Sequence, residues 1–379
     1  MKVVVAIDSF KGSLSSVQAG NAVREGVLRA VPEAEVIVRP VADGGEGTVD
    51  ALVEGLAGEK MPVCVTGPLG EPVCCAYGML PGGMAVMEMA SCSGLPLVPP
   101  EKRNPRFTTT YGLGEMILHA LERGCRSFLI GIGGSATNDG GIGMLTALGF
   151  RFLTAAGESA GIDGRAAGRV ACIDASGADA RLEQCRFRIA CDVSNPLFGP
   201  NGASCIYGPQ KGATPEIAAE LDDGLRHFSE VVKHQFGRSG DQLPGSGAAG
   251  GLGYAFISFL PAVLEPGIAL VLDAIHIADD MDGADFVITG EGRMDFQTAM
   301  GKAPIGIAQL GKRCGAVTLA FAGATADDAA AVNQSGIDAY FAIPQAPLAL
   351  AEAMEPGHAR RNLASRVEQV FRAITAVKK

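Results

Sequence analysis

The fold is decided by residues 2–48, which read KVVVAIDSFKGSLSSVQAGNAVREGVLRAVPEAEVIVRPVADGGEGT. The β-branched run Val3–Ile7 is typical of a strand that is buried on both faces. Ser15 and Gln18 form a capping-box pattern ahead of a helix, and Glu35–Val41 predicts a second strand. Because strand, helix and strand follow one another within about fifty residues, the chain opens on a βαβ unit with a parallel sheet.

The middle of the chain has a different pattern. Short strands at 63–66, 73–80 and 85–89 are separated by Gly/Pro turns, without room for crossover helices. Further along, Thr214-Pro215 predicts the start of a long helix that ends at Gly237.

After residue 285 the α/β rhythm of the N-terminus returns. Strands are predicted at Phe286–Thr289, Val317–Ala322 and Ala339–Ile343, and helices at about 305–313, 326–334 and 361–377. We therefore predict an α/β fold with two α/β domains. One is a mostly parallel, three-layer, Rossmann-like or flavodoxin-like domain that is discontinuous in sequence (1–75 plus 285–379). The other is an inserted mixed α/β domain (76–284).

The composition limits the choice of partner. The chain has 379 residues, of which 47% are hydrophobic, and 31 Lys and Arg against 41 Asp and Glu give a formal net charge of −10. This charge argues against nucleic acid and against an anionic membrane surface as partners. A small anionic substrate held by a few local cations remains compatible with it.

The cysteines and histidines do not form a zinc pattern. None of the 10 Cys forms a C-x-x-C pair, and the 5 His are far apart. The cysteines therefore indicate small buried hydrophobes in a reducing compartment, and we expect a cytoplasmic protein. The most apolar window, 254–272, is interrupted at Glu265-Pro266-Gly267 and predicts helix, turn and strand rather than a membrane span.

A glycine-rich segment follows one predicted strand and opens a helix. It runs from Gly131 to Gly141 and reads GIGGSATNDGG. Backbone N–H groups at such a turn can bind phosphate. The segment also fits the dinucleotide fingerprint, but the acidic residue expected about twenty positions on is Glu158, which falls in a predicted turn. Phosphate or nucleotide binding, nicotinamide binding and a purely structural turn stay open.

Charged residues follow several other predicted strands, where ligands bind in open α/β sheets. Lys11 could hold an anion or be a solvated surface lysine. Asp43, in the segment DGGEGT, could bind Mg²⁺ or cap a helix. Asp192 ends a buried strand ahead of the loop that contains Lys211, and could instead cap a turn. The richest cluster, beyond the strand at 286–289, contains Glu291, Arg293, Asp295 and Lys302.

Several enzyme classes are excluded by missing motifs. The chain has no Walker A sequence, no H-R-D or D-F-G kinase signature and no G-x-S-x-G elbow. P-loop NTPases, protein kinases and acyl-transfer hydrolases are therefore unsupported.

The ordered segments resemble the bacterial glycerate kinase family of type I. The matching blocks are Asp8–Ser13, Asp43–Thr48, Arg103-Asn104-Pro105, Thr108–Glu115, Gly131–Gly141, Cys191–Asn195, Gly208–Ala213 and Thr289–Gly306, and together they extend from residue 2 to about 375. The resemblance implies phosphorylation of D-glycerate by ATP with Mg²⁺, usually at the 2-hydroxyl. It also implies a cleft between two α/β domains, and it leaves a homodimer open.

Phosphoryl transfer needs positioning and neutralisation of charge, and the strand-end residues are assigned to these tasks. We predict catalytic roles for Asp192, Asp43, Lys11 and Arg293, with Asp192 as the base. Metal binding is predicted for Asp8 and Asp295. Nucleotide binding is predicted for Gly131, Gly133, Gly134, Ser135, Asn138, Asp139, Lys211, Glu291 and Lys302.

Two other functions stay open. A nicotinamide-dependent oxidoreductase acting on a small hydroxy acid would show a change in cofactor absorbance and need no ATP. A non-catalytic sensor of sugar acids would need a DNA-binding module, and the sequence offers neither a basic helix pair nor a spare domain.

Overall fold

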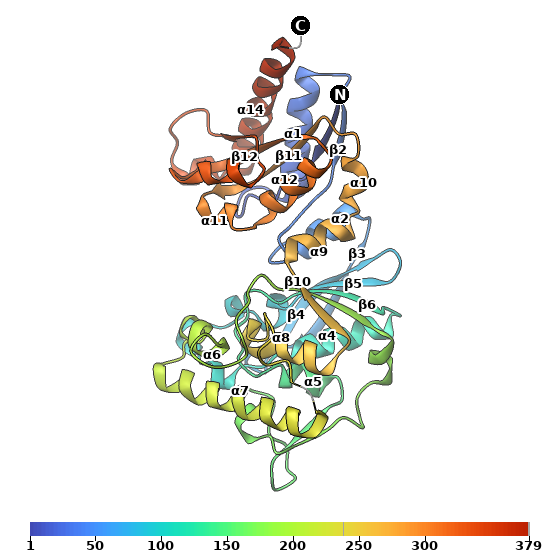
Figure 1. The fold of residues 1–379 in the computed structure, drawn as a ribbon, viewed down its shortest axis with the longest axis vertical. Helices are drawn as coiled ribbons and strands as arrows, with labels where there is room; N and C mark the ends of the chain where they lie inside the picture. The colour runs from blue at the N-terminus through green and yellow to red at the C-terminus, as the bar shows by residue number, and fades with distance from the viewer. Residues whose placement is uncertain (238, 378–379) are drawn as a thin grey trace. The chain divides into compact units, whose positions relative to one another are not determined.

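The computed structural model describes residues 1–237 and 239–377 of the chain. The chain divides into two compact units, and Figure 1 labels many of their helices and strands. Unit 1 contains Met1–Asp43, Asp50–Ala57 and the chain from Ile268 onward, whereas unit 2 contains Gly44–Val49 and Gly58–Gly267.

Unit 1 is built on a five-stranded sheet in the order β13-β12-β11-β1-β2, and every pair in it is parallel. Val4 of β1 pairs with Val287 on one side and with Ile37 on the other. The predicted sheet, which joins the first and last parts of the chain, is therefore confirmed. Its strands are β1 (Lys2–Val5), β2 (Glu35–Val38), β11 (Phe286–Met294), β12 (Val317–Thr325) and β13 (Ala339–Ala342).

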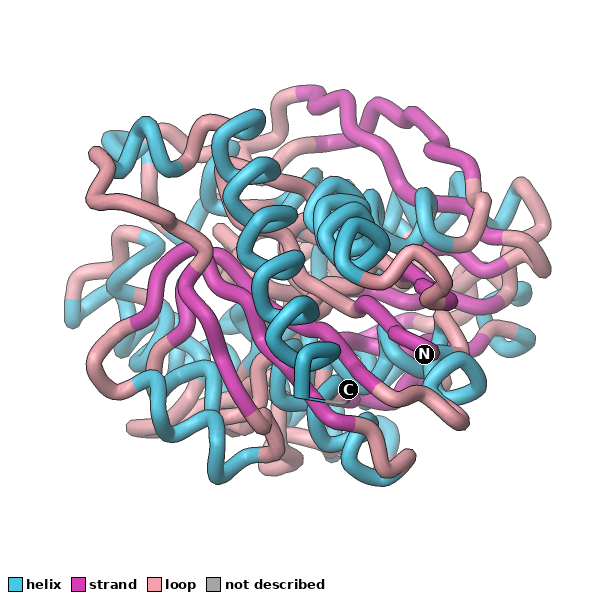
Figure 2. Tube along the Cα trace, turned by 90° about the horizontal axis from the view of Figure 1, so that it is seen from above, coloured by secondary structure: helices cyan, strands magenta, loops and turns pink. Residues whose placement is uncertain are grey.

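Helices cover both faces of this sheet and complete the predicted three layers. Helices α1 (Ser16–Ala30) and α14 (Pro356–Val377) pack together on one face, where Figure 2 shows the C-terminal helix lying across the strands. Leu319 and Phe321 point to that face, whereas Ala320 and Ala322 pack on the other face with α12 (Ala303–Arg313). The other helices wholly or largely in this unit are α2 (Thr48–Gly55), α9 (Gly267–Ala274), α10 (Ile277–Met281), α11 (Phe296–Ala299), α13 (Leu350–Ala353) and the 3₁₀ helix η7 (Ala329–Ser335).

Unit 2 contains a mixed six-stranded sheet in the order β10-β9-β6-β5-β4-β3. The pairs β3–β4 and β4–β5 are antiparallel, as the short turns predict, and the remaining pairs are parallel. The strands are β3 (Glu59–Thr66), β4 (Pro72–Leu80), β5 (Met84–Glu88), β6 (Ser127–Gly131), β9 (Arg186–Ala190) and β10 (Ala262–Glu265), with a separate pair β7 (Arg151–Leu153) and β8 (Cys172–Asp174).

The helices of unit 2 pack on this sheet around an aromatic core, in which the rings of Phe128 and Phe187 stack at 4.7 Å between centroids. The long helix has the predicted ends, because Thr214 accepts a bond from the Ile217 N–H and Gly237 takes a φ of 69°. The α-helices are α3 (Ala90–Ser93), α4 (Tyr111–Glu122), α5 (Ile142–Ala147), α6 (Ala203–Tyr207), α7 (Pro215–Phe236) and α8 (Ala248–Phe259). The 3₁₀ helices are η1 (Leu95–Leu97), η2 (Pro100–Lys102), η3 (Pro105–Phe107), η4 (Ala167–Arg169), η5 (Ala180–Gln184) and η6 (Pro209–Lys211).

The limits of the units differ from the predicted domain limits at 75 and 285. Residues 58–75 lie in unit 2 because β3 pairs along its length with β4. Residues 268–284 lie in unit 1, where the Asp280 carboxylate accepts a hydrogen bond from Arg39 Nε at 2.6 Å. The β3–β4 hairpin therefore assigns residues 58–75 to unit 2, and the Arg39–Asp280 ion pair ties residues 268–284 to unit 1.

Two element predictions are wrong. In the window 254–272, the sequence predicts a strand after Pro266. Instead, strand β10 comes before Pro266 and helix α9 comes after it. The segment 326–334 is largely the 3₁₀ helix η7 instead of an α-helix. Within the described residues, none of the helices combines the length and apolar character needed to cross a membrane.

The prediction that all cysteines are small buried hydrophobes is also wrong. Cys64 and Cys74 occupy paired positions on β3 and β4 and form a disulfide, because the antiparallel register brings them face to face. Cys172 and Cys205 are exposed, while Cys92 and Cys125 are buried as expected.

Candidate functional site

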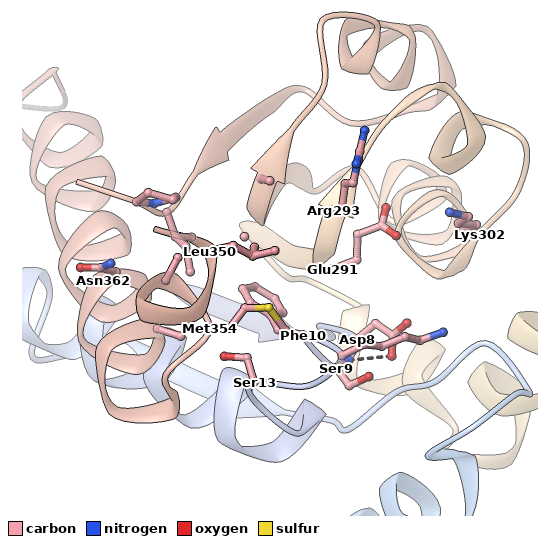
Figure 3. A pocket seen from close by; sticks show the side chains of 18 of the residues that line it. Asp8, Ser9, Phe10, Ser13, Glu291, Arg293, Lys302, Leu350, Met354 and Asn362 are labelled. Carbon is pink, nitrogen blue, oxygen red and sulfur yellow. Dashed lines mark hydrogen bonds between the residues drawn. The ribbon is translucent and has the colours of Figure 1, made fainter. Parts of the chain in front are cut away.

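Unit 1 contains a cavity of about 510 Å³ at the carboxyl ends of its strands (Figure 3). Parallel strands bring their carboxyl ends to one edge of a sheet, so the segments after β1 and along the second half of β11 meet there. The cavity collects six of the residues predicted for the site: Asp8, Lys11, Asp43, Glu291, Arg293 and Lys302.

Asp8 is a buried carboxylate in this cavity, and its pKa is strongly raised. Its side chain is buried, with only 9% of the residue exposed, and Oδ1 accepts the Ser9 N–H at 2.6 Å. Burial and the nearby Asp43 charge raise the pKa of Asp8 to about 7, while the Ser9 bond and Lys11 act in the opposite direction. Asp8 therefore exchanges its proton near neutral pH.

Glu291 is a second buried carboxylate in the cavity. Its Oε1 accepts a hydrogen bond from the Thr298 hydroxyl at 2.6 Å. Burial raises the pKa of Glu291, and the Thr298 bond and the Lys302 charge partly offset this effect. The Thr298 bond fixes the position of the Glu291 carboxylate. Its burial makes the charged form unfavourable unless a further cation lies nearby.

The carboxylates of the cavity fit a Mg²⁺ ion. Asp8, Asp43 and Glu291 act on one another electrostatically, so a divalent cation would offset the repulsion that raises the pKa of Asp8. Within the described residues, no group of three or more His, Cys, Asp or Glu is arranged to hold a metal ion by itself. Mg²⁺ usually takes one or two carboxylates together with water and substrate phosphates, so this donor set fits an ion that is shared with a bound phosphate.

Asp295, the other predicted metal ligand, caps a helix. Its carboxylate accepts the Gln297 N–H at 3.0 Å and forms a capping box with Thr298 at the start of α11. It also lies 3.8 Å from Arg293 Nε. These contacts account for its position after β11 and engage its carboxylate at the start of α11.

In unit 2, the glycine-rich loop leaves the sheet beside Asp192. Gly131 of β6 pairs with Ala190 of β9, so the segments that follow them start from the same edge. A Cβ on Gly131 would lie 2.1 Å from the Gly44 carbonyl oxygen, which explains the need for glycine there. Asp192 Oδ1 accepts the Gly267 N–H at 2.9 Å. The backbone of Gly133 and Gly134 is exposed at this edge.

Lys211 is buried and packs against the glycine-rich loop. Its Nζ donates to Ser135 Oγ at 2.8 Å and to the Thr137 carbonyl at 2.7 Å. Burial lowers the pKa of Lys211 to about 7, and the Asp139 charge partly opposes this shift. Since its bonds go to the loop, Lys211 holds the loop in shape and does not present a free cation.

Asp139 and Asn138 are also engaged inside the loop. Asp139 Oδ2 accepts the Thr110 N–H at 2.8 Å and the Thr110 hydroxyl at 2.7 Å, and the Gly141 and Gly143 N–H groups complete its bonds. Asn138 Nδ2 donates to Ser204 Oγ at 3.0 Å. Burial raises the pKa of Asp139, and these four donors counteract the rise. The side chains predicted to bind nucleotide thus brace the loop.

The comparison with known families identifies the chain. The profile of the glycerate kinase family matches residues 3–375. The chain belongs to the glycerate kinase family. It is therefore an enzyme of the kinase and transferase class, as the ordered sequence blocks predict.

Relatives in this family share nearly half of the sequence. A glycerate kinase of Halalkalibacterium halodurans is 47% identical over 99% of this chain and 97% of its own length. A glycerate 2-kinase of Escherichia coli K12 is 47% identical over 90% of both chains. A crystal structure assigned provisionally as glycerate kinase 2 from Salmonella typhimurium LT2 has a TM-score of 0.92 and 43% identity, and the match covers 100% of this chain and 99% of the other.

The alternative that the glycine-rich loop binds a nicotinamide cofactor has no support in this fold. The fingerprint requires an acidic residue at the end of the next parallel strand. Glu158 is exposed in a tight turn, in which its carbonyl accepts the Thr154 N–H at 2.8 Å. Helix α5, which follows the glycine-rich loop, has only six residues.

Sequence reasoning missed the cavity residues that carry no charge, among them Phe10, Met354 and Asn362. Phe10 and Met354 look like ordinary core residues in sequence. Asn362 had a usable signal, because it is a polar residue three positions after Ala359 and one before Leu363 in the buried stripe of α14.

Proposed function

We propose that this member of the glycerate kinase family transfers the γ-phosphoryl group of ATP to the 2-hydroxyl of D-glycerate, with Mg²⁺, to give 2-phospho-D-glycerate. The observation that carries the proposal is the family match over residues 3–375 together with a cavity that groups carboxylates and cations. The name of the Escherichia coli relative, glycerate 2-kinase, supports the choice of hydroxyl.

We propose that Asp8 and Glu291 hold Mg²⁺, since they are the most buried carboxylates of the cavity. When bound, the ion would neutralise charge on the phosphates. Lys302, Lys11 and Arg293 line the same cavity and would contribute positive charge to the triphosphate. Lys11 and Arg293 are exposed, so they can reach a ligand without breaking a buried contact.

The acceptor hydroxyl must lose a proton as its oxygen bonds to the γ-phosphorus and the bond to the β-phosphate oxygen breaks. We propose the Asp192 carboxylate as the group that takes this proton, with Asp43 as the second candidate. The Gly267 N–H donates to Asp192 Oδ1 just beyond the end of β9, at the edge of the sheet from which the glycine-rich loop also starts. Those glycine N–H groups could bind an anionic oxygen of a substrate.

The other assignments follow from these roles. Ser135, Asn138, Asp139 and Lys211 act as positioning residues that keep the glycine-rich loop in shape. We place the reaction in the cytoplasm, where ATP is available, and a homodimer remains an expectation from the sequence.

Turnover with purified protein tests the proposal. With ATP and Mg²⁺, addition of D-glycerate should start ADP release, and EDTA should stop it. ATP hydrolysis at the same rate without glycerate, or turnover that persists in excess EDTA, would contradict the proposal. A change in nicotinamide absorbance on addition of D-glycerate, without ATP, would support the oxidoreductase instead.

A further inference from the structure

One end of the unit 1 cavity contains an amide side chain that has no hydrogen-bond partner among the described residues. Asn362, on α14, lines the cavity and only 8% of the residue is exposed. In the described part of the chain, its side chain forms no hydrogen bond. In Figure 3 it lies on the opposite side from Glu291, Arg293 and Lys302. An amide that lines a cavity and has no partner in the described protein is free to pair with a polar group of a ligand.

Between this amide and the charged end, the cavity wall is apolar. Phe10 and Ile343 are buried, each with 3% of the residue exposed, and Met354 lies against the turn at Gly12. Leu350 lines the same cavity but is 75% exposed, so its side chain stands at the mouth without cover. The wall therefore offers apolar contact, with the Asn362 amide at its far end.

The middle of the cavity offers a second unpaired group. The Ser13 hydroxyl oxygen is buried and has no hydrogen-bond partner within the described protein. Gly292 and Gly323, which also line the cavity, present backbone without side chains. A ligand group that carries hydroxyls, such as a ribose, could pair with the Ser13 hydroxyl here.

The cavity has a charged end, a hydroxyl in its middle and an apolar wall with an amide at the other end. Of the two proposed substrates, only the nucleotide matches this arrangement. Glycerate is small, charged and polar throughout, so an apolar wall would not recognise it. A nucleotide presents phosphates, a ribose and an aromatic base whose edge carries donors and acceptors. An Asn amide can accept a hydrogen bond from the adenine 6-amino group and donate to an adjacent ring nitrogen.

We propose that the apolar end of the unit 1 cavity is a purine-base pocket and that Asn362 selects adenine by pairing with the edge of the base. The base lies between Phe10, Ile343 and Met354, with Leu350 covering its outer face. The ribose lies near Ser13, and the phosphates extend toward Lys302 and Glu291. This inference rests on the proposed function only in taking ATP as the phosphoryl donor.

The substitution Asn362→Asp tests the pocket, because it keeps the shape and removes the donor. Calorimetry would compare the affinities of the wild type and the variant for Mg-ATP, for Mg-inosine triphosphate and for Mg-tripolyphosphate, which has no base. The wild type should prefer ATP over inosine triphosphate by about tenfold or more, and the variant should bind ATP about tenfold more weakly. Its affinity for tripolyphosphate should stay within about twofold of that of the wild type.

Two further variants keep the test decisive. Asn21→Asp adds the same charge at an exposed position of α1 and should leave all three affinities unchanged. Leu350→Ser cannot disturb the core, because Leu350 is exposed, and it should weaken ATP binding several-fold without affecting tripolyphosphate. Unchanged ATP affinity in Asn362→Asp would overturn the proposal, as would an equal loss of affinity for tripolyphosphate in either pocket variant.

The outcomes separate this inference from the proposed function. If the wild type turns over D-glycerate but Asn362→Asp keeps its affinity for ATP, the pocket is wrong and the function stands. If the variant loses ATP affinity as expected but the wild type does not phosphorylate glycerate, the pocket stands and the function is wrong. A wild type that does not bind ATP contradicts both.

Discussion

At the residue scale, Asp8 should make the stability of the ligand-free protein depend on pH. Its pKa is about 7 in the folded chain and near 3.8 when exposed, so the folded state holds the proton more tightly between these values. The free energy of unfolding therefore falls as pH rises from about 4 to 7, by at most about 4 kcal/mol. Asp8→Asn should remove this dependence and stabilise the ligand-free protein at pH 8 relative to the wild type.

Urea unfolding of the metal-free protein at pH 5 and pH 8 measures this effect. Asp279→Asn, on exposed surface of the same unit, serves as the matched control and should follow the wild type. If Asp8→Asn lost as much stability as the wild type between the two pH values, the carboxylate would not be the cause.

A second residue-scale prediction concerns the proton of the acceptor hydroxyl. Asp192→Asn keeps the side-chain oxygen that accepts the Gly267 N–H and removes the basicity. It should lower kcat by about a hundredfold or more while leaving ATP affinity within a few-fold. Steady-state kinetics and nucleotide titration check the two values separately. A near-normal kcat in Asp192→Asn would contradict Asp192 as the base. Asp43 would then be the candidate, and Asp43→Asn would be measured next.

At the element scale, the glycine-rich loop should depend on Asp139 for its shape. The carboxylate joins the loop to the start of α4 through Thr110 and to the start of α5 through Gly141 and Gly143. Asp139→Ala leaves these donors without a partner in a buried site, which should cost about 3 kcal/mol or more in unfolding free energy.

Urea unfolding and tripolyphosphate binding distinguish bracing from direct nucleotide contact. Thr110→Val, which removes one donor and keeps the carboxylate, should cost less, about 1 kcal/mol. Both folded variants should bind tripolyphosphate as the wild type does. A selective loss of tripolyphosphate affinity at normal stability would instead favour the nucleotide-binding role that the sequence predicted for Asp139.

Helices and strands that carry a capping pattern or a clear hydrophobic period were predictable from sequence, and those without such a pattern were not. Ser15 and Gln18 form the expected capping box, with both hydrogen bonds present. In the window 254–272, a run of apolar residues has no period that separates strand from helix, so the order around Pro266 was wrong. In η7, Asn333 and Ser335 can compete for backbone hydrogen bonds, and Asn333 Nδ2 donates to the Ile337 carbonyl, so the alanines alone do not sustain an α-helix.

At the scale of the whole molecule, the return of the α/β rhythm after residue 285 was enough to predict that β11 lies beside β1. It was not enough to locate the unit limits, because the pairing of β3 with β4 is a long-range contact without a sequence signature. The charged residues of the cavity were predictable from strand ends. The position of Asn362 in the buried stripe of α14 was a usable signal, but its place in the cavity and its lack of a partner in the described protein depend on tertiary packing.

The central claim is that this member of the glycerate kinase family phosphorylates the 2-hydroxyl of D-glycerate. Phosphorus NMR of a reaction containing the purified protein, ATP, Mg²⁺ and D-glycerate tests it most directly, because authentic 2-phospho- and 3-phospho-D-glycerate give separate signals. The account predicts that the 2-phospho-D-glycerate signal grows in step with ADP and is absent without glycerate. A product at the 3-position would contradict the proposed regiochemistry, and ADP with inorganic phosphate alone would contradict the kinase reaction itself.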